Sequence, residues 1–140
     1  MGSQSSQKVP SVFKFDKSAP GGFKWGFRLE DDPDRICFSK LSYRYPDPAQ
    51  IHAAQTLASF STKPGKLPPN RKVTDGMTKF LEAIRAVAID RMTADWRKYF
   101  VESTPMEAIL TVPAVWSDKA KSDTLQCAHK AGFGELNKID

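Results

Sequence analysis

Residues 106–134, MEAILTVPAVWSDKAKSDTLQCAHKAGFG, carry the signals of a strand, a turn and a helix in direct succession. The apolar run 109–112 predicts a buried strand, which Pro113 must end or push to a sheet edge because proline has no amide to donate to a ladder. Ser117 and Asp118 offer side-chain oxygens to the open amides of a new helix, and Gly132 is typical of the position just beyond a helix end. We expect the rest of the chain to be organised around this unit.

Two stretches near the start of the chain predict a β-hairpin. Residues 9–15 and 23–29 alternate apolar and polar side chains, and residues 16–22 between them contain the turn sequence Ser-Ala-Pro-Gly-Gly. The alternation places four apolar residues of the second strand on one face, which we interpret as core rather than as a stacking platform for bases: Phe23, Trp25, Phe27 and Leu29. The acidic stretch 30–34 lacks the glycine and the final carboxylate of a calcium loop, so we interpret it as a solvated loop.

The clearest helix is expected over residues 74–98. Thr74 is the expected N-cap, and Asp75 suits the positive end of the helix dipole. One face is apolar and predicts a core-facing stripe that continues through Trp96 toward Phe100: Met77, Phe80, Leu81, Ile84, Val87, Ala88 and Arg91. A short loop over 101–105 is expected to join this helix to the strand.

Other parts of the chain are irregular. Residues 1–8 are polar, and we expect them to be disordered. Residues 42–70 contain five prolines and predict an irregular, mostly looped insert with one short helix. The length of 140 residues predicts a single domain over 9–140.

Charge and cysteine content argue against several classes of function. The net charge is +5, but the 21 Lys and Arg are scattered among 16 Asp and Glu without a basic run, so nucleic-acid binding is disfavoured. Cys37 and Cys127 lie far apart and belong to no CxxC motif, which argues against a metal site. No signal peptide and no apolar run of membrane-spanning length is visible, so we expect no membrane association and a reducing, cytoplasmic setting.

The sequence ILTVPAVWSD at 109–118, followed by Ala131-Gly132-Phe133, resembles the heat shock protein 70 family. In that family the matching segment belongs to the actin-like ATPase domain, where a strand ending in Thr-Val-Pro-Ala precedes a helix that finishes in Ala-Gly. Trp116 favours a divergent branch. The resemblance spans about 9–133 and implies an α/β fold, namely the first-lobe portion of a partial actin-like (ribonuclease H-like) nucleotide-binding domain, with a strand pair, a long helix, a strand and a final helix.

The resemblance also implies a chemistry. Family members bind ATP and Mg²⁺ in a cleft between two lobes and couple hydrolysis to the grip of a separate substrate domain. By position, Lys40 is the candidate catalytic lysine, which would direct positive charge at the transferred phosphate. Pro113 and Lys121 match the proline and the basic residue that relay signals between the two domains. The simpler alternatives are a surface lysine, a strand terminator and a solvated helix lysine, respectively.

The printed sequence contains no Asp-Leu-Gly-Thr-Thr-like loop before Val9 and no later Asp-Gly-Gly-Gly-Thr-like loop. Such loops supply the amides that hold the phosphates. We therefore expect an N- and C-terminally truncated piece of a chaperone ATPase domain that does not hydrolyse ATP by itself, and binding of ATP and Mg²⁺ is left open.

The expected partners follow from the same resemblance. They are other chaperone components, or unfolded protein held by a substrate domain outside this chain, and self-association through an exposed apolar face. The alternative function is a non-catalytic protein-interaction module derived from that domain. Nucleic-acid binding, suggested only by the net positive charge, is a third hypothesis.

Overall fold

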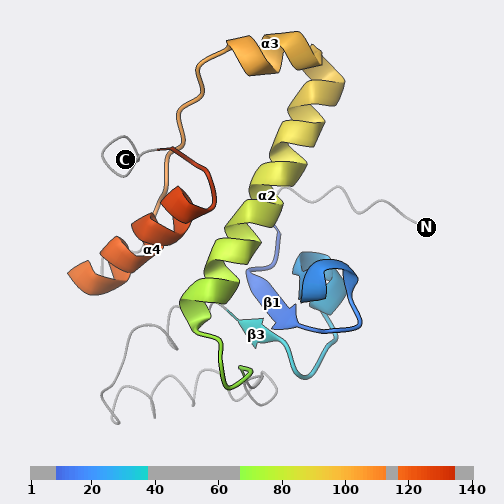
Figure 1. The fold of residues 1–140 in the computed structure, drawn as a ribbon, viewed down its shortest axis with the longest axis vertical. Coiled ribbons are helices and arrows are strands. Elements are labelled where there is room, and N and C mark those ends of the chain that lie inside the picture. Colours follow the sequence, from blue (N-terminus) through green and yellow to red (C-terminus); the bar gives the residue numbers. More distant parts are fainter. Residues whose placement is uncertain (1–8, 38–66, 113–116, 135–140) are drawn as a thin grey trace. The chain divides into compact units, whose positions relative to one another are not determined.

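The computed structural model describes residues 9–37, 67–112 and 117–134. The chain divides into two compact units, Met1–Arg71 and Lys72–Asp140. In the described residues, the first unit contains a small antiparallel sheet and the second contains helices, so the mixed α/β class expected from the sequence is confirmed (Figure 1). The expected disordered terminus and most of the proline-rich insert lie outside the described residues.

Strand β1 is the centre of the sheet in the first unit. β1 (Val12–Phe15) pairs antiparallel with β2 (Phe23–Trp25) on one side and with β3 (Ile36–Cys37) on the other. Phe15 lies opposite Phe23, and Phe13 lies opposite Trp25. The predicted hairpin is therefore confirmed, and a short third strand extends it.

Aromatic rings on one face fix the register of this hairpin. The ring centroids of Phe13, Phe15 and Phe23 are separated by 5.6, 5.8 and 5.5 Å, in two edge-on pairs and one stacked pair. Phe13 is fully buried, and the Arg71 guanidinium lies 5.3 Å from the centroid of the Phe15 ring. Each aromatic pair contributes about 0.5–1.5 kcal/mol beyond the area it buries, and a slipped register would lose these contacts.

The polar face of the hairpin carries two lysines directly opposite each other. Lys14 and Lys24 are Cα partners, and like charges in that position destabilise a strand pair. Each lysine has its own carboxylate. Lys14 Nζ lies 3.0 Å from an Asp32 oxygen, and Lys24 Nζ lies 2.6 Å from an Asp16 oxygen. These ion pairs remove the repulsion that the register would otherwise create.

The second strand is shorter than its sequence pattern predicts. β2 ends at Trp25 because Gly26 has φ +65°, and the 3₁₀ turn η2 (Gly26–Leu29) follows. The prediction that Phe27 and Leu29 continue the face of the strand is therefore wrong. Leu29 is fully buried all the same, because the turn carries it into the core.

The acidic stretch 30–34 is an ordered turn. The Arg35 guanidinium donates hydrogen bonds to the carbonyls of Leu29, Glu30 and Asp32. The Asp32 carboxylate also accepts from the Asp34 amide at 2.9 Å. The turn therefore holds Asp32 in place for its ion pair with the hairpin.

Helices make up the regular structure described in the second unit. They are α2 (Val73–Trp96), α3 (Lys98–Ser103) and α4 (Asp118–Lys130), and α4 packs along α2 (Figure 1). Among the described residues, no helix combines the length and the apolar content needed to span a bilayer.

Helix α2 begins slightly earlier than predicted. The Asp75 carboxylate accepts a hydrogen bond from the Lys72 amide at 2.7 Å, and Lys72 occupies the N-cap position. Thr74 lies inside the helix, so its prediction as the N-cap is wrong. Asp75 satisfies the first open amide from within the helix, as the third residue of a capping box does.

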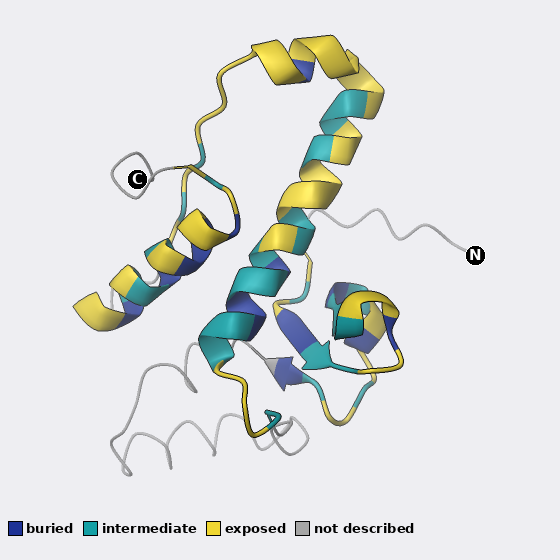
Figure 2. Cartoon of the chain, in the orientation of Figure 1, coloured by how far each residue is buried: buried dark blue, intermediate teal, exposed yellow. Residues whose placement is uncertain are grey.

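The apolar stripe of α2 is buried only near its beginning. Met77 and Phe80 are buried, and Leu81 and Ile84 are half-buried. Beyond them the predicted core face is exposed, so the prediction is wrong for three of its residues: Val87, Ala88 and Arg91 (Figure 2). The second half of α2 therefore presents apolar side chains to solvent.

Helix α4 has the ends that the sequence predicts. The Ser117 hydroxyl accepts from the Ala120 amide at 3.2 Å, which confirms Ser117 as the N-cap. Gly132 has φ +88°, and the Phe133 amide donates to the Ala128 carbonyl at 3.1 Å, as in a Schellman motif. Cys127 is buried with Sγ 3.5 Å from the Thr74 carbonyl of α2, and burial raises the pKa of this thiol.

Two expectations for the connection between α3 and α4 are wrong. Residues 101–103 belong to α3 rather than to a loop, and residues 109–112 form no strand with any described residue. Ile109 exposes 77% of its surface instead of being buried. The apolar sequence is strand-like, but the sheet strands of the described residues all belong to the other compact unit.

Replacing Gly26 by alanine should destabilise the protein by about 1–2 kcal/mol because an L-residue at positive φ is strained. A Cβ at this position would also lie 3.0 Å from Val9 Cγ1. Gly21→Ala is the matched control, since Gly21 has φ +69° and nothing within 4 Å of the added atom. Urea unfolding should give a lower free energy of unfolding for Gly26→Ala than for Gly21→Ala. The reverse order would contradict the close contact between residue 26 and Val9.

The ion pairs of the hairpin predict a loss of stability in acid. Lys24 lowers the pKa of Asp16, and the Asp34 amide together with Lys14 lowers the pKa of Asp32. A lowered folded-state pKa stabilises the fold above the unfolded value of about 3.9, and this stabilisation is lost as the pH falls through the folded-state pKa.

Thermal unfolding between pH 7 and pH 2 tests this directly. Asp16→Asn should lower Tm at pH 7, and the difference from the wild type should shrink below about pH 4 as Asp16 becomes protonated in the unfolded chain. Asp31→Asn, at an exposed position of the acidic turn, is the control. A difference between Asp16→Asn and wild type that stays constant across this range would show that the ion pair does not stabilise the fold.

Candidate functional site

Of the three residues singled out from the sequence, only Lys121 lies within the part of the chain that the structure describes. Lys40 and Pro113 lie outside the described residues. Lys121 lies on α4, is half-buried, and places Nζ 3.8 Å from the Asp118 carboxylate one turn earlier. This geometry is that of a lysine at a helix surface.

The described glycines do not form a cradle for phosphate groups. Gly21 and Gly22 both have positive φ, but they close the hairpin. The Gly22 amide donates to the Ala19 carbonyl at 2.8 Å, and the Gly22 carbonyl accepts from the Asp16 amide at 3.0 Å. Within the described ranges, no three His, Cys, Asp or Glu side chains are grouped to hold a metal ion. Neither observation assigns a nucleotide or metal site to the described residues.

Exposed aromatic side chains gather where α2 ends and α3 begins. Trp96 exposes 60% of its surface, Tyr99 82% and Phe100 46%, and the ring centroids of Trp96 and Phe100 are 5.4 Å apart. We call these three residues the aromatic corner, and Figure 2 shows that this end of the helices is mostly exposed. Exposed apolar clusters mark interaction sites, and aromatic residues contribute strongly to binding at protein interfaces.

Arg97 gives the aromatic corner its shape. It has φ +69° and ψ 144°, a conformation that residues other than glycine rarely adopt, and it separates α2 from α3. Its amide donates to the Thr93 carbonyl at 3.1 Å, which closes the last turn of α2. Strain of this kind costs about 1–3 kcal/mol and persists only where the surrounding structure imposes it. The direction change at Arg97 places the rings of α3 beside the end of α2.

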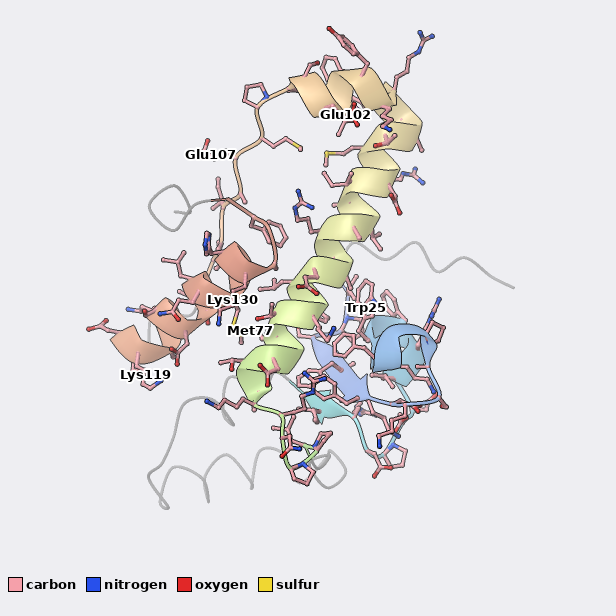
Figure 3. All side chains as sticks on the ribbon, in the orientation of Figure 1. Trp25, Met77, Glu102, Glu107, Lys119 and Lys130 are labelled. Carbon is pink, nitrogen blue, oxygen red and sulfur yellow. The ribbon has the colours of Figure 1, made fainter. Side chains whose placement is uncertain are left out.

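Two ion pairs lie close to the aromatic corner. Arg91 Nε lies 3.1 Å from the Asp95 carboxylate, and Lys98 Nζ lies 3.7 Å from the Glu102 carboxylate. Glu102 lies on α3, as labelled in Figure 3. Both pairs join residues four apart on an exposed helix surface, where such pairs contribute little to stability. The corner therefore presents apolar rings beside two ion pairs and the additional cation Arg97.

The segment 105–112 adds a second exposed apolar surface. Met106 exposes 54% of its surface and Ile109 exposes 77%. Glu107 is the one charged residue of this segment (Figure 3). Between α3 and α4 the chain thus carries strand-forming side chains without a neighbouring strand among the described residues.

The aromatic corner was not predicted from the sequence. The apolar stripe of α2 continues in sequence through Trp96 toward Phe100, so both rings were expected to be buried. A signal was present in the sequence. Four charged residues surround the three rings within eight positions: Asp95, Arg97, Lys98 and Glu102. Buried helix faces rarely carry that density of charge, so the pattern indicates an exposed surface.

Arg97→Gly should stabilise the protein by about 1 kcal/mol, because glycine adopts positive φ without the penalty of a Cβ atom. Arg97→Ala is the control, since it removes the charge but keeps the Cβ, and its stability should match the wild type. Urea unfolding measures the free energies of unfolding of the two variants. If Arg97→Gly were less stable than Arg97→Ala, residue 97 would lie in a continuous helix, where glycine costs about 1 kcal/mol.

Comparison of the chain with protein-family models, with curated proteins and with solved structures gives no match.

Proposed function

We propose that this chain is a first-lobe portion of a cytoplasmic, heat shock protein 70-like ATPase domain, and that it acts through contacts with other protein rather than by hydrolysing ATP. The support for the family is the sequence ILTVPAVWSD at 109–118 together with Ala131-Gly132-Phe133. The order of a hairpin, a long helix and a final helix in the described residues is compatible with it.

The observation that carries the proposal is the state of segment 105–112. Its apolar sequence is typical of a strand inside a sheet, yet Ile109 is exposed and no described residue pairs with the segment. Unpaired strand backbone and exposed aliphatic side chains are costly in water and invite pairing with another chain. The segment has the composition of a strand that needs a neighbour, and the described residues supply none.

Two observations argue against independent catalysis. The printed sequence has neither glycine-rich phosphate loop of the family. The described glycine turn uses the amide and carbonyl of Gly22 to close the hairpin. Without amides directed at the phosphates, a lysine such as Lys40 has no positioned phosphate on which to act.

Titration of MgATP into the purified chain tests the non-catalytic part of the proposal. Calorimetry should show no binding heat, and Tm should not change, because a ligand that binds only the folded state must raise Tm by mass action. Micromolar binding with a raised Tm, both lost in Lys40→Ala, would contradict the proposal and assign a nucleotide site.

Amide hydrogen exchange on the same samples tests the observation on which the proposal depends. The amides of 106–112 should exchange as fast as in an unstructured peptide, with or without MgATP, whereas the amides of α2 should be protected. Slow exchange over 106–112 in the isolated chain would mean that the strand is already paired.

A further inference from the structure

Thr104 follows helix α3, and its side chain takes part in the C-terminal cap. The Phe100 carbonyl accepts from the Thr104 amide at 3.1 Å and from the Thr104 hydroxyl at 2.6 Å. The hydroxyl of the neighbouring Ser103 reaches the same carbonyl at 3.3 Å. Helix α3 has six residues, so the hydrogen bonds to this carbonyl are a large part of what closes its last turn.

The backbone at Thr104 is extended and leads into an exposed segment. Thr104 has φ −94° and ψ 124°, as expected before a proline, because the ring of Pro105 disfavours the helical conformation in the preceding residue. Thr104 and the three residues after it are exposed, and residues 105–112 have no regular secondary structure. The Thr104 hydroxyl therefore lies on a part of the chain that a modifying enzyme can reach.

Thr104-Pro105 is the one place in the sequence where a serine or threonine precedes a proline. Proline has a fixed φ and no amide hydrogen, so an enzyme pocket that offers the backbone no acceptor at this position selects it over other residues. We propose that Thr104 is the phosphorylation site of a proline-directed protein kinase, with ATP as the phosphoryl donor.

The chemical step uses only the threonine, ATP and the kinase. The Thr104 oxygen attacks the γ-phosphorus of ATP, and the bond from this phosphorus to the bridging oxygen breaks, so that ADP leaves. The hydroxyl proton passes to the catalytic base of the kinase.

The phosphate would act against the end of α3. Phosphorylation removes the proton that Thr104 donates to the Phe100 carbonyl and adds about two negative charges near the C-terminal carbonyls of a helix, where negative charge is unfavourable. Glu102 and Glu107 lie within three positions of Thr104 and add to the repulsion. The buried residue of α3 is Val101, and α3 packs on α2. Phosphorylation should therefore loosen α3 and expose Val101.

This inference is independent of the proposed function, because the kinase and not this chain holds the ATP. The two also fail separately. Titration of MgATP without kinase reports on the proposed function, and transfer of phosphate to Thr104 by the kinase reports on the inference.

Incubation of the full chain with MgATP and a purified, active mitogen-activated protein kinase, followed by mass spectrometry of its peptides, tests the proposal. One phosphate should appear, on Thr104, and Thr104→Ala should lose it. Pro105→Ala keeps the acceptor hydroxyl and should slow phosphorylation by about tenfold or more. Ser103→Ala is the matched control, since Ser103 is exposed and bonds to the same carbonyl but does not precede a proline. Its phosphorylation rate should match that of the wild type.

Amide hydrogen exchange of the phosphorylated and the unmodified chain tests the effect on α3. The amides of residues 101–104 should exchange about tenfold or more faster after phosphorylation, whereas those of α4 should not change. Equal exchange over 101–104 in the two forms would show that the phosphate does not loosen the helix.

Three results would overturn the assignment of the site. They are a wild-type chain that takes up no phosphate, a phosphate on a residue other than Thr104, and a Pro105→Ala variant that is phosphorylated as fast as the wild type.

Discussion

The second unit depends on the small side chains of α4, which let its backbone lie close to α2. The buried positions of α4 and its C-terminal turn are all small: Ala120, Thr124, Cys127, Ala128 and Ala131. A helix rises about 1.5 Å per residue, so the 13 residues of α4 span about 20 Å and the 24 residues of α2 about 36 Å. Cys127 meets Thr74, and Gly132 lies beside Arg85. Helix α4 therefore packs on the early turns of α2, while Val87 and the residues beyond it include exposed apolar side chains.

In the first unit, the stability of the hairpin depends on aromatic contacts and ion pairs together. The aromatic pairs among Phe13, Phe15 and Phe23 set a register that places Lys14 opposite Lys24. That register is tolerable because Asp16 and Asp32 pair with the two lysines. The hydrogen bonds that Arg35 donates to the acidic turn hold Asp32 where Lys14 needs it, so residues that look like a solvated loop support the strand pair.

The two apolar surfaces of the second unit have different chemistry. Segment 105–112 has aliphatic, strand-forming side chains and forms no ladder with any described residue, which suits addition to a sheet. The aromatic corner has rings on helices with balanced ionic neighbours, which suits side-chain packing against another helix.

The sequence by itself determined the features that depend on neighbouring residues. Helix α4 begins after Ser117 and ends before Gly132, as predicted. Capping depends on one hydroxyl at the N-terminal end and on one residue with positive φ at the C-terminal end. Alternation with a Pro-Gly-Gly turn was sufficient for the hairpin. The start of α2 was predicted to within one or two residues, although Asp75 and not Thr74 satisfies the first amide.

Only the tertiary structure decided which apolar residues are buried. Val87, Trp96 and Ile109 carry the pattern of core residues, yet all three are exposed. A side chain is buried only where another element covers it, and the period of the sequence does not show how far that element extends. The strand at 109–112 failed for the same reason, since a strand needs a neighbour to accept its hydrogen bonds. The positive φ values of Gly26 and Arg97 redirect the chain at points where the local pattern continues unchanged. Local propensity thus determined the hairpin, helices α2 and α4 and the caps of α4, while the limited length of α4 decided which part of α2 is exposed.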